Sequence, residues 1–193
     1  MLRPSVAVVI PWRPSPGRER NLDAVRRGLR GVFGTYEPAT LGVAAVDLVL
    51  ADSGHDPFSR AASRNTGARQ TRTDVLVVCD GDAIVEREPI HAAIKAAGDG
   101  KLHLPYTSAR LLTQAGSEAV HMGAAPHLAD AWFTNPYSVG GCVVVAYETW
   151  QAVGGWDERF IGWGFEDTAF WAAVDTLYGL VNHASARCGA APM

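Results

Sequence analysis

Two carboxylates separated by one glycine, Asp80-Gly81-Asp82, directly follow a short apolar run rich in valine at residues 74–79. Such a run predicts a buried strand, and open α/β folds bind ligands at the carboxyl ends of their strands. Two oxygen donors at that edge can bind a divalent cation, which in such sites usually also takes phosphate oxygens from a substrate. A solvated Asp-Gly-Asp turn is the competing interpretation, because both residue types are common in turns.

A second candidate lies far along the chain, where glycines alternate with large aromatic residues over 154–165 and Glu166 and Asp167 follow. Trp156 and Trp163 offer flat apolar faces of the kind that stack on sugar rings. The two carboxylates open a predicted helix, where the helix dipole alone would also favour acidic residues. A loop with this much tryptophan could equally be part of the core.

Further polar residues follow the first two predicted strands. Pro11-Trp12-Arg13 comes after the first strand and Asp52 after the second. Asp52 could accept hydrogen bonds from the imide edge of a pyrimidine, or it could cap a turn. Arg64, on the helix after the second strand, could lie beside a diphosphate, pair with Asp52 or Asp80, or be a surface arginine.

The elements that must position these residues alternate between strand and helix in the first half of the chain. The pattern predicts an α/β fold with a mostly parallel sheet flanked by helices. In such a sheet the ends of the first three strands lie side by side, so the polar clusters should converge on one cleft. Residues 107–135 show no clear pattern. The predicted strands are 5–10, 46–51, 75–79, 102–106 and 140–146, and the predicted helices are 18–33, 58–70, 89–97, 147–153 and 166–177.

Composition bounds the class of protein. The chain of 193 residues is 48% hydrophobic and carries a formal net charge of −3, which predicts a single globular domain and gives no electrostatic case for nucleic-acid binding. No apolar stretch is long enough to span a bilayer, and residues 1–5 do not resemble a signal peptide. Cys79 and Cys142 lie in strand-like runs and are expected to be reduced core thiols, which favours a cytoplasmic location.

Taken together, these residues resemble the GT-A glycosyltransferases of the family 2 type, from Val6 to about Gly179. The matching segments are Val8-Val9-Ile10-Pro11, Asp52, Arg64-Asn65-Thr66-Gly67 and Asp80-Gly81-Asp82 as the "DxD" element. The block from Gly154 to Asp167 is similar to the carboxy-terminal motif of the β-1,4-galactosyltransferases and the polypeptide N-acetylgalactosaminyltransferases. The resemblance implies one Rossmann-like GT-A domain over 1–193, with a nucleotide-sugar-binding half (1–105), an acceptor and catalytic half (106–180) and a tail (181–193).

The resemblance also implies roles for single residues. Asp167 matches the catalytic base, and Glu166 would hold acceptor hydroxyls. Asp82 would bind Mn²⁺ or Mg²⁺. Family members usually have a metal-binding histidine beyond the last helix, and here only His183 stands in that region. The residues expected to bind the nucleotide sugar are Pro11, Arg13, Asp52, Arg64, Asp80, Gly81 and Trp163.

The predicted function is therefore a metal-dependent glycosyltransferase. It would move a hexose or N-acetylhexosamine from a nucleotide-diphosphate sugar, a UDP-sugar first of all, to a hydroxyl of a saccharide or protein acceptor. One alternative is a nucleotidyltransferase, which predicts a glycine-rich basic loop after the first strand; residues 13–18 match that only loosely. Another is a nucleotide-sugar-binding protein that has lost catalysis.

Overall fold

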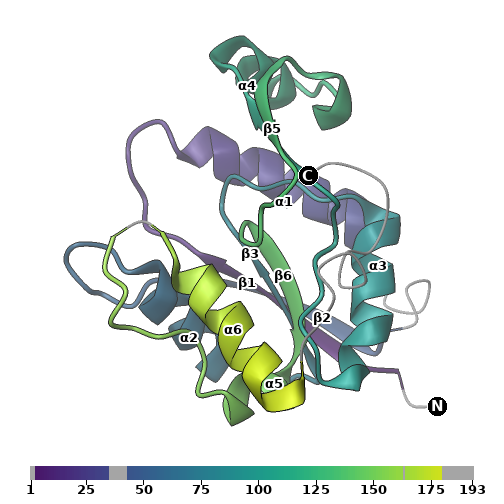
Figure 1. Cartoon of the computed structure of the whole chain (residues 1–193). Helices are drawn as coiled ribbons and strands as arrows, with labels where there is room; N and C mark the ends of the chain where they lie inside the picture. The colour runs from purple at the N-terminus through teal and green to yellow at the C-terminus, as the bar shows by residue number, and fades with distance from the viewer. Residues whose placement is uncertain (1–2, 35–42, 163, 180–193) are drawn as a thin grey trace.

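The computed structural model describes residues 3–34, 43–162 and 164–179. The central sheet has four strands in the order β2-β1-β3-β6, and a separate pair, β4-β5, forms a small antiparallel hairpin. Figure 1 shows the central sheet with the hairpin projecting beyond it. The strands are β1 (Ser5–Pro11), β2 (Ala45–Ala51), β3 (Val75–Cys79), β4 (Ala109–Leu112), β5 (Ala131–Asn135) and β6 (Cys142–Ala146).

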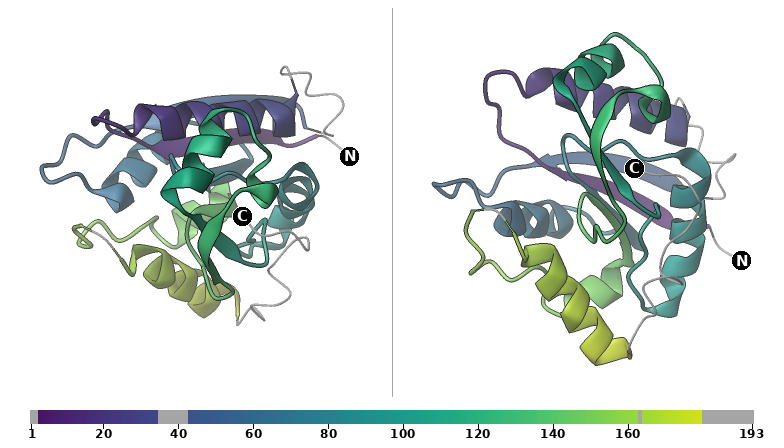
Figure 2. Two further views of the ribbon diagram at one scale, coloured as in Figure 1. Left: turned by 90° about the horizontal axis from the view of Figure 1, so that it is seen from above. Right: turned by 45° about the horizontal axis from the view of Figure 1, so that its top comes forward.

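Helices cover both faces of the central sheet. The views in Figures 1 and 2 place α1 and α3 on one face and α2, α5 and α6 on the other. The α-helices are α1 (Glu19–Phe33), α2 (Arg60–Arg69), α3 (Arg87–Ala96), α4 (Gln114–His121), α5 (Tyr147–Ala152) and α6 (Glu166–Tyr178), with short 3-10 turns η2 (Ala97–Asp99) and η3 (Pro126–Leu128). The predicted mostly parallel sheet flanked by helices is confirmed.

The register of the sheet brings three strand ends together. β1 pairs in parallel with β2, so that Pro11 lies beside Ala51, and in parallel with β3 on its other side. β6 is antiparallel to β3, with Cys142 opposite Cys79. The two cysteines are buried and free, as predicted. β3 reads as a continuous apolar run because all five of its residues are buried, as expected for a strand covered on both faces.

Residues 102–106 are not a strand, so that prediction is wrong. The segment forms only isolated bridges, and His103 pairs with Val144 through two backbone hydrogen bonds of 2.8 Å. Pro105 follows two residues later and has no N–H, so it cannot extend a ladder along the edge of β6. The segment is buried because Leu102, Leu104 and Tyr106 enter the core, and this apolar content is what imitates a strand in the sequence.

The region 107–135, which had no clear sequence pattern, forms a small unit of β4, α4, η3 and β5 beside α1. The hairpin has a register irregularity between Leu111 and Leu112. A satellite cluster of Ala24, Val120 and Ala129 joins this unit to α1. Among the described residues, none of the helices is both long and apolar enough to cross a membrane.

Candidate functional site

The polar clusters predicted to converge do so at the carboxyl edge of the sheet. Pro11 ends β1, Asp52 directly follows β2, and Asp80 directly follows β3. Because β2, β1 and β3 are adjacent and parallel, these three positions lie at one edge. A hydrogen bond of 2.8 Å from Trp12 N to Ala51 O continues the pairing of β1 and β2 up to that edge.

Gly81, between the two carboxylates, packs closely against the ring of Trp12. A Cβ atom at this position would lie 2.6 Å from Cε3 of the Trp12 ring. No larger residue fits without moving that buried ring. The chain therefore passes over Trp12 and presents Asp80 and Asp82 on either side of the contact, with Asp80 N donating a hydrogen bond of 2.7 Å to Gly141 O.

Asp82 is the more accessible of the two carboxylates, with a side chain that is 51% exposed. Its nearest cation is Arg18, at 3.6 Å. Partial burial and the neighbouring charge of Asp80 raise the pKa of Asp82 above its ordinary value, against the opposing effect of Arg18. A carboxylate in this setting gains from a bound cation, which would offset the repulsion from Asp80.

The described residues include no group of three or more His, Cys, Asp or Glu side chains able to hold a metal ion. Mg²⁺ is commonly bound by one or two protein carboxylates, with substrate phosphates and water completing its shell. The oxygen donors of Asp82 and Asp80 fit that pattern. His183, the predicted further ligand, lies outside the described residues, as does Trp163.

Arg13 and Asp52 bind each other in the structure. Arg13 Nε and Nη2 donate to the two carboxylate oxygens of Asp52 at 2.7 and 2.8 Å. Gly54 N also donates to Asp52, and these hydrogen bonds, chiefly that from Arg13, lower the pKa of Asp52. The pair is partly exposed, so a ligand could reach it. The predicted contacts of Arg13 and Asp52 with the nucleotide stay a prediction.

Arg64 is the centre of the site. Its side chain is only 2% exposed and lies between carboxylates from two distant segments. Nη2 donates to Asp80 Oδ1 at 2.8 Å, and Nη1 donates to Asp167 Oδ1 at 2.6 Å and to Glu166 Oε1 at 3.3 Å. Burial alone would lower the pKa of Arg64, but these carboxylates outweigh burial and raise it. Of the alternatives open for Arg64, the structure shows the pairing with Asp80; the contact with α6 was missed, and the predicted contact of Arg64 with the nucleotide sugar stays a prediction.

Glu166 and Asp167 occupy the first turn of α6, as predicted. The helix begins after Phe165, which has a left-handed φ of 69°. Glu166 is buried and also forms an ion pair of 2.8 Å with Arg60. In the structure Glu166 is bound to two arginines, Arg60 and Arg64. Its predicted role in holding acceptor hydroxyls stays a prediction.

Asp167 keeps some exposure, with a side chain 18% accessible. Burial is the main effect that raises the pKa of Asp167. Arg64 and a hydrogen bond of 3.3 Å from Trp156 Nε1 oppose that rise. Gly140 stands against this carboxylate: a Cβ there would overlap Asp167 Oδ2. The lack of a side chain at Gly140 therefore leaves the room that the carboxylate occupies.

Trp156 is core, so the expectation that its face is open to a sugar is wrong. It is 1% exposed and stacks on Phe170, with ring centroids 4.0 Å apart. Asn65 anchors the same loop: it accepts from Trp156 N at 2.9 Å and donates to Trp156 O at 2.7 Å. No role was predicted for Asn65, although it stands next to Arg64 in the sequence. Its partner Trp156 is 91 residues away, so no local pattern indicates the contact.

A family described as "N-terminal domain of galactosyltransferase" matches residues 121–182. This segment is less than half of the chain and contains Glu166 and Asp167. No curated protein sequence matches the chain.

Among solved structures, the catalytic domain of Drosophila β1,4-galactosyltransferase 7 in complex with xylobiose aligns with a TM-score of 0.60 at 17% identity. A mutant of that enzyme in complex with manganese, UDP-Gal and xylobiose aligns with a TM-score of 0.57 at 18% identity. Each alignment covers 92% of this chain, and the chain spans 63% of the length of each structure. The predicted GT-A fold and the resemblance to glycosyltransferases of that fold are confirmed.

Proposed function

We propose that this chain, which has the GT-A fold, is a metal-dependent glycosyltransferase that uses a nucleotide-diphosphate sugar, with a UDP-sugar as the first candidate. The transferred group would be a hexose or an N-acetylhexosamine, and the acceptor a hydroxyl of a saccharide or protein. One observation carries the proposal: Arg64 joins Asp80, at the end of β3, to Asp167, in the first turn of α6. A candidate donor-binding carboxylate and a candidate base thus share one site.

The reaction needs a leaving phosphate and a proton acceptor. In a direct displacement, the acceptor oxygen forms a bond to the anomeric carbon of the donor. The bond from that carbon to the diphosphate oxygen breaks, and its electron pair leaves with the nucleotide diphosphate. We assign Asp167 as the base that takes the acceptor proton, since its pKa is raised and it remains partly exposed. A positioned carboxylate of this kind contributes roughly 10²–10⁴-fold to rate.

Arg64 orients this base. The contact of 2.6 Å to Asp167 Oδ1 and the contact of 2.8 Å to Asp80 hold both carboxylates at fixed positions. A fixed charge arrangement that is complete before the reaction needs no reorganisation during it. We therefore assign Arg64 as the residue that holds the base relative to the donor.

The donor would lie along the carboxyl edge of the sheet. Arg13 and Asp52 would contact the base of the nucleotide, with Pro11 beside it, and Asp80 would face the ribose. Asp82 would hold Mn²⁺ or Mg²⁺ together with the diphosphate. When bound, such a cation offsets the negative charge that develops on the leaving phosphate.

Isothermal titration calorimetry with UDP-Gal, with and without Mn²⁺, tests this function. We expect binding that depends on Mn²⁺, and loss of that dependence in Asp82→Asn, because the variant removes the accessible carboxylate charge at the edge of β3. Asp47→Asn is the matched control: Asp47 is exposed within β2, away from that edge. Equal, Mn²⁺-independent affinity in all three proteins would contradict the proposal, as would no binding of UDP-, GDP-, CMP- or dTDP-sugars to the wild type.

A further inference from the structure

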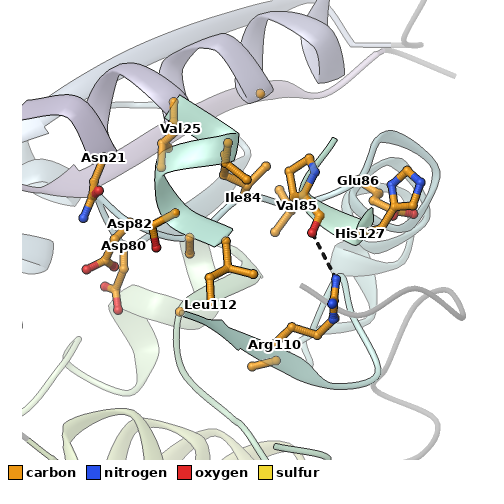
Figure 3. Close-up of a pocket in the computed structure, with 18 of the residues that line it drawn as sticks. Asn21, Val25, Asp80, Asp82, Ile84, Val85, Glu86, Arg110, Leu112 and His127 are labelled. Carbon is orange, nitrogen blue, oxygen red and sulfur yellow. Dashed lines mark hydrogen bonds between the residues drawn. The ribbon is translucent and has the colours of Figure 1, made fainter. Parts of the chain in front are cut away.

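A cavity of about 800 Å³ lies between α1, the segment after Asp82 and the β4–β5 hairpin. Its size falls within the range of small-molecule sites, about 300–1,000 Å³. In Figure 3 the lining residues Asp80, Asp82 and Asn21 lie together at one end of the cavity, and Glu86, Arg110 and His127 lie toward the other. The cavity therefore begins at the carboxylates of the candidate donor site.

The walls between these ends are mostly apolar. They are formed by side chains from α1, from the segment 83–85 and from the hairpin unit, chiefly Val25, Ile84, Val85, Leu112 and Val120. Charged groups stand at the far end, where Glu86 and Arg110 both line the cavity. Arg110 is already bound to the backbone, since it donates to Pro126 O at 3.0 Å and to Ala129 O at 2.8 Å. The middle of the cavity consequently offers apolar surface and few hydrogen-bonding groups.

The acid end carries a fixed polar pair. His121 Nε2 and Asn21 Oδ1 are 2.8 Å apart, and both residues line the cavity. With Oδ1 engaged by the ring, the Nδ2 group of Asn21 is the donor that this residue can offer to a ligand. A ligand with a polar head at this end and an apolar body beyond it would match the distribution of groups.

We propose that this cavity binds the apolar aglycone of the acceptor, so that the acceptor is a glycoside or hydroxyl compound with an alkyl or aromatic portion. This inference rests on the proposed glycosyltransferase function. The donor does not fit the apolar walls. Its base is assigned to Arg13 and Asp52, which do not line this cavity, and its ribose, diphosphate and sugar are polar, so that burying their hydroxyls without hydrogen-bond partners is unfavourable. An alkyl or aromatic portion of an aglycone has no such groups and gains from leaving water. The apolar occupant therefore belongs to the second substrate.

Binding of n-octyl β-D-glucopyranoside, below its micelle concentration, compared with methyl β-D-glucopyranoside tests the site without any need for turnover. The two probes share a head group and differ only in the apolar chain. We expect the octyl compound to bind at least ten-fold more tightly by calorimetry. Equal affinities for the two probes would overturn the inference.

Leu112→Trp places a larger side chain on the cavity wall and should weaken octyl glucoside binding at least ten-fold, with unchanged affinity for UDP-Gal and Mn²⁺. Leu177→Trp makes the same substitution at an exposed position on α6 and should alter neither. Ser117→Phe, from the α4 side of the cavity, gives the same test if Leu112→Trp does not fold. Octyl binding that survives both cavity variants would overturn the inference.

The two proposals fail in different ways. If the wild type binds UDP-Gal with Mn²⁺ but shows no preference for the octyl chain, the aglycone site is wrong and the transferase function stands. If the wild type binds the octyl probe, sensitive to Leu112→Trp, but no nucleotide sugar, the transferase function is wrong and with it the identification of the occupant as an acceptor.

Discussion

Replacing Arg64 by methionine tests the arrangement at the centre of the site. Methionine keeps an apolar stem of similar length but removes the cation between Asp80, Asp167 and Glu166. The carboxylates would then be partly buried with their main compensating charge removed, although Arg60 still reaches Glu166 at 2.8 Å. The free energy of unfolding should therefore fall.

The size of the loss follows from burial. Removing one partner of a buried ion pair costs about 3–5 kcal/mol. Asp80 and Asp167 retain side-chain exposures of 21% and 18%, so water relieves part of the penalty and we expect about 3 kcal/mol. For a protein of this length, that corresponds to a fall in Tm of about 6–12 °C.

The loss should also depend on pH. Burial already raises the pKa of Asp167, and removal of Arg64 raises it further, above its value in the unfolded chain. A carboxyl group with a raised pKa in the folded state destabilises the fold when ionised, and protonation removes that penalty. The deficit of Arg64→Met relative to wild type should therefore shrink as the pH falls from 7 toward 5.

Urea denaturation followed by circular dichroism at pH 7 and pH 5 measures both effects. Arg69→Met is the control, because the Arg69–Glu158 pair is largely exposed on the arginine side and should contribute at most about 1 kcal/mol. The double variant Arg64→Met/Asp167→Asn should be more stable than Arg64→Met alone. A deficit below 1 kcal/mol at pH 7, or one that does not change with pH, would refute the reasoning.

Other expectations concern catalysis. Asp167→Asn should bind UDP-Gal normally but turn over roughly 10²–10⁴-fold more slowly, and wild-type kcat in this variant would remove Asp167 as the base. Because burial raises the pKa of Asp167, kcat/KM should fall on the acid side at a pH above the ordinary aspartate range; a profile flat down to pH 4 would contradict this. Gly140→Ala should reduce kcat through displacement of Asp167, whereas Gly98→Ala, where a Cβ meets nothing within 4 Å, should not; equal activities would show that Gly140 does not position the base.

The central sheet and its polar edge could be predicted from the sequence because their signals are local. Short apolar runs mark β1, β2 and β3, and the first polar residues after them mark one edge of a parallel sheet. Segment 102–106 was wrongly predicted as a strand because three of its residues are apolar and pack in the core. Pro105 prevents a ladder there because it has no N–H. The hairpin unit was missed because β4 and β5 are short and only partly buried, so that they lack strict alternation.

The contacts within the site could not be derived in the same way. Arg64 was expected to lie beside a diphosphate, to pair with Asp52 or Asp80, or to be a surface arginine. Its contacts with Glu166 and Asp167 join residues 102 and 103 positions apart. The local spacing of apolar and polar residues contains no information about a contact between residues so far apart in the sequence. The stacking of Trp156 on Phe170 could not be predicted for a similar reason. A tryptophan flanked by glycines has the same local sequence whether its ring faces a sugar or the core.

Successive residues of α2 hold two different parts of the carboxy-terminal block: Arg64 binds the start of α6, and Asn65 binds the backbone at Trp156. Exchange of residues 154–178 between proteins of this fold, as in a chimera built to change acceptor choice, would separate both anchors from their partners. Segment 60–69 should travel with the exchanged block, so that the two pieces form one transplantable module despite the length of chain between them.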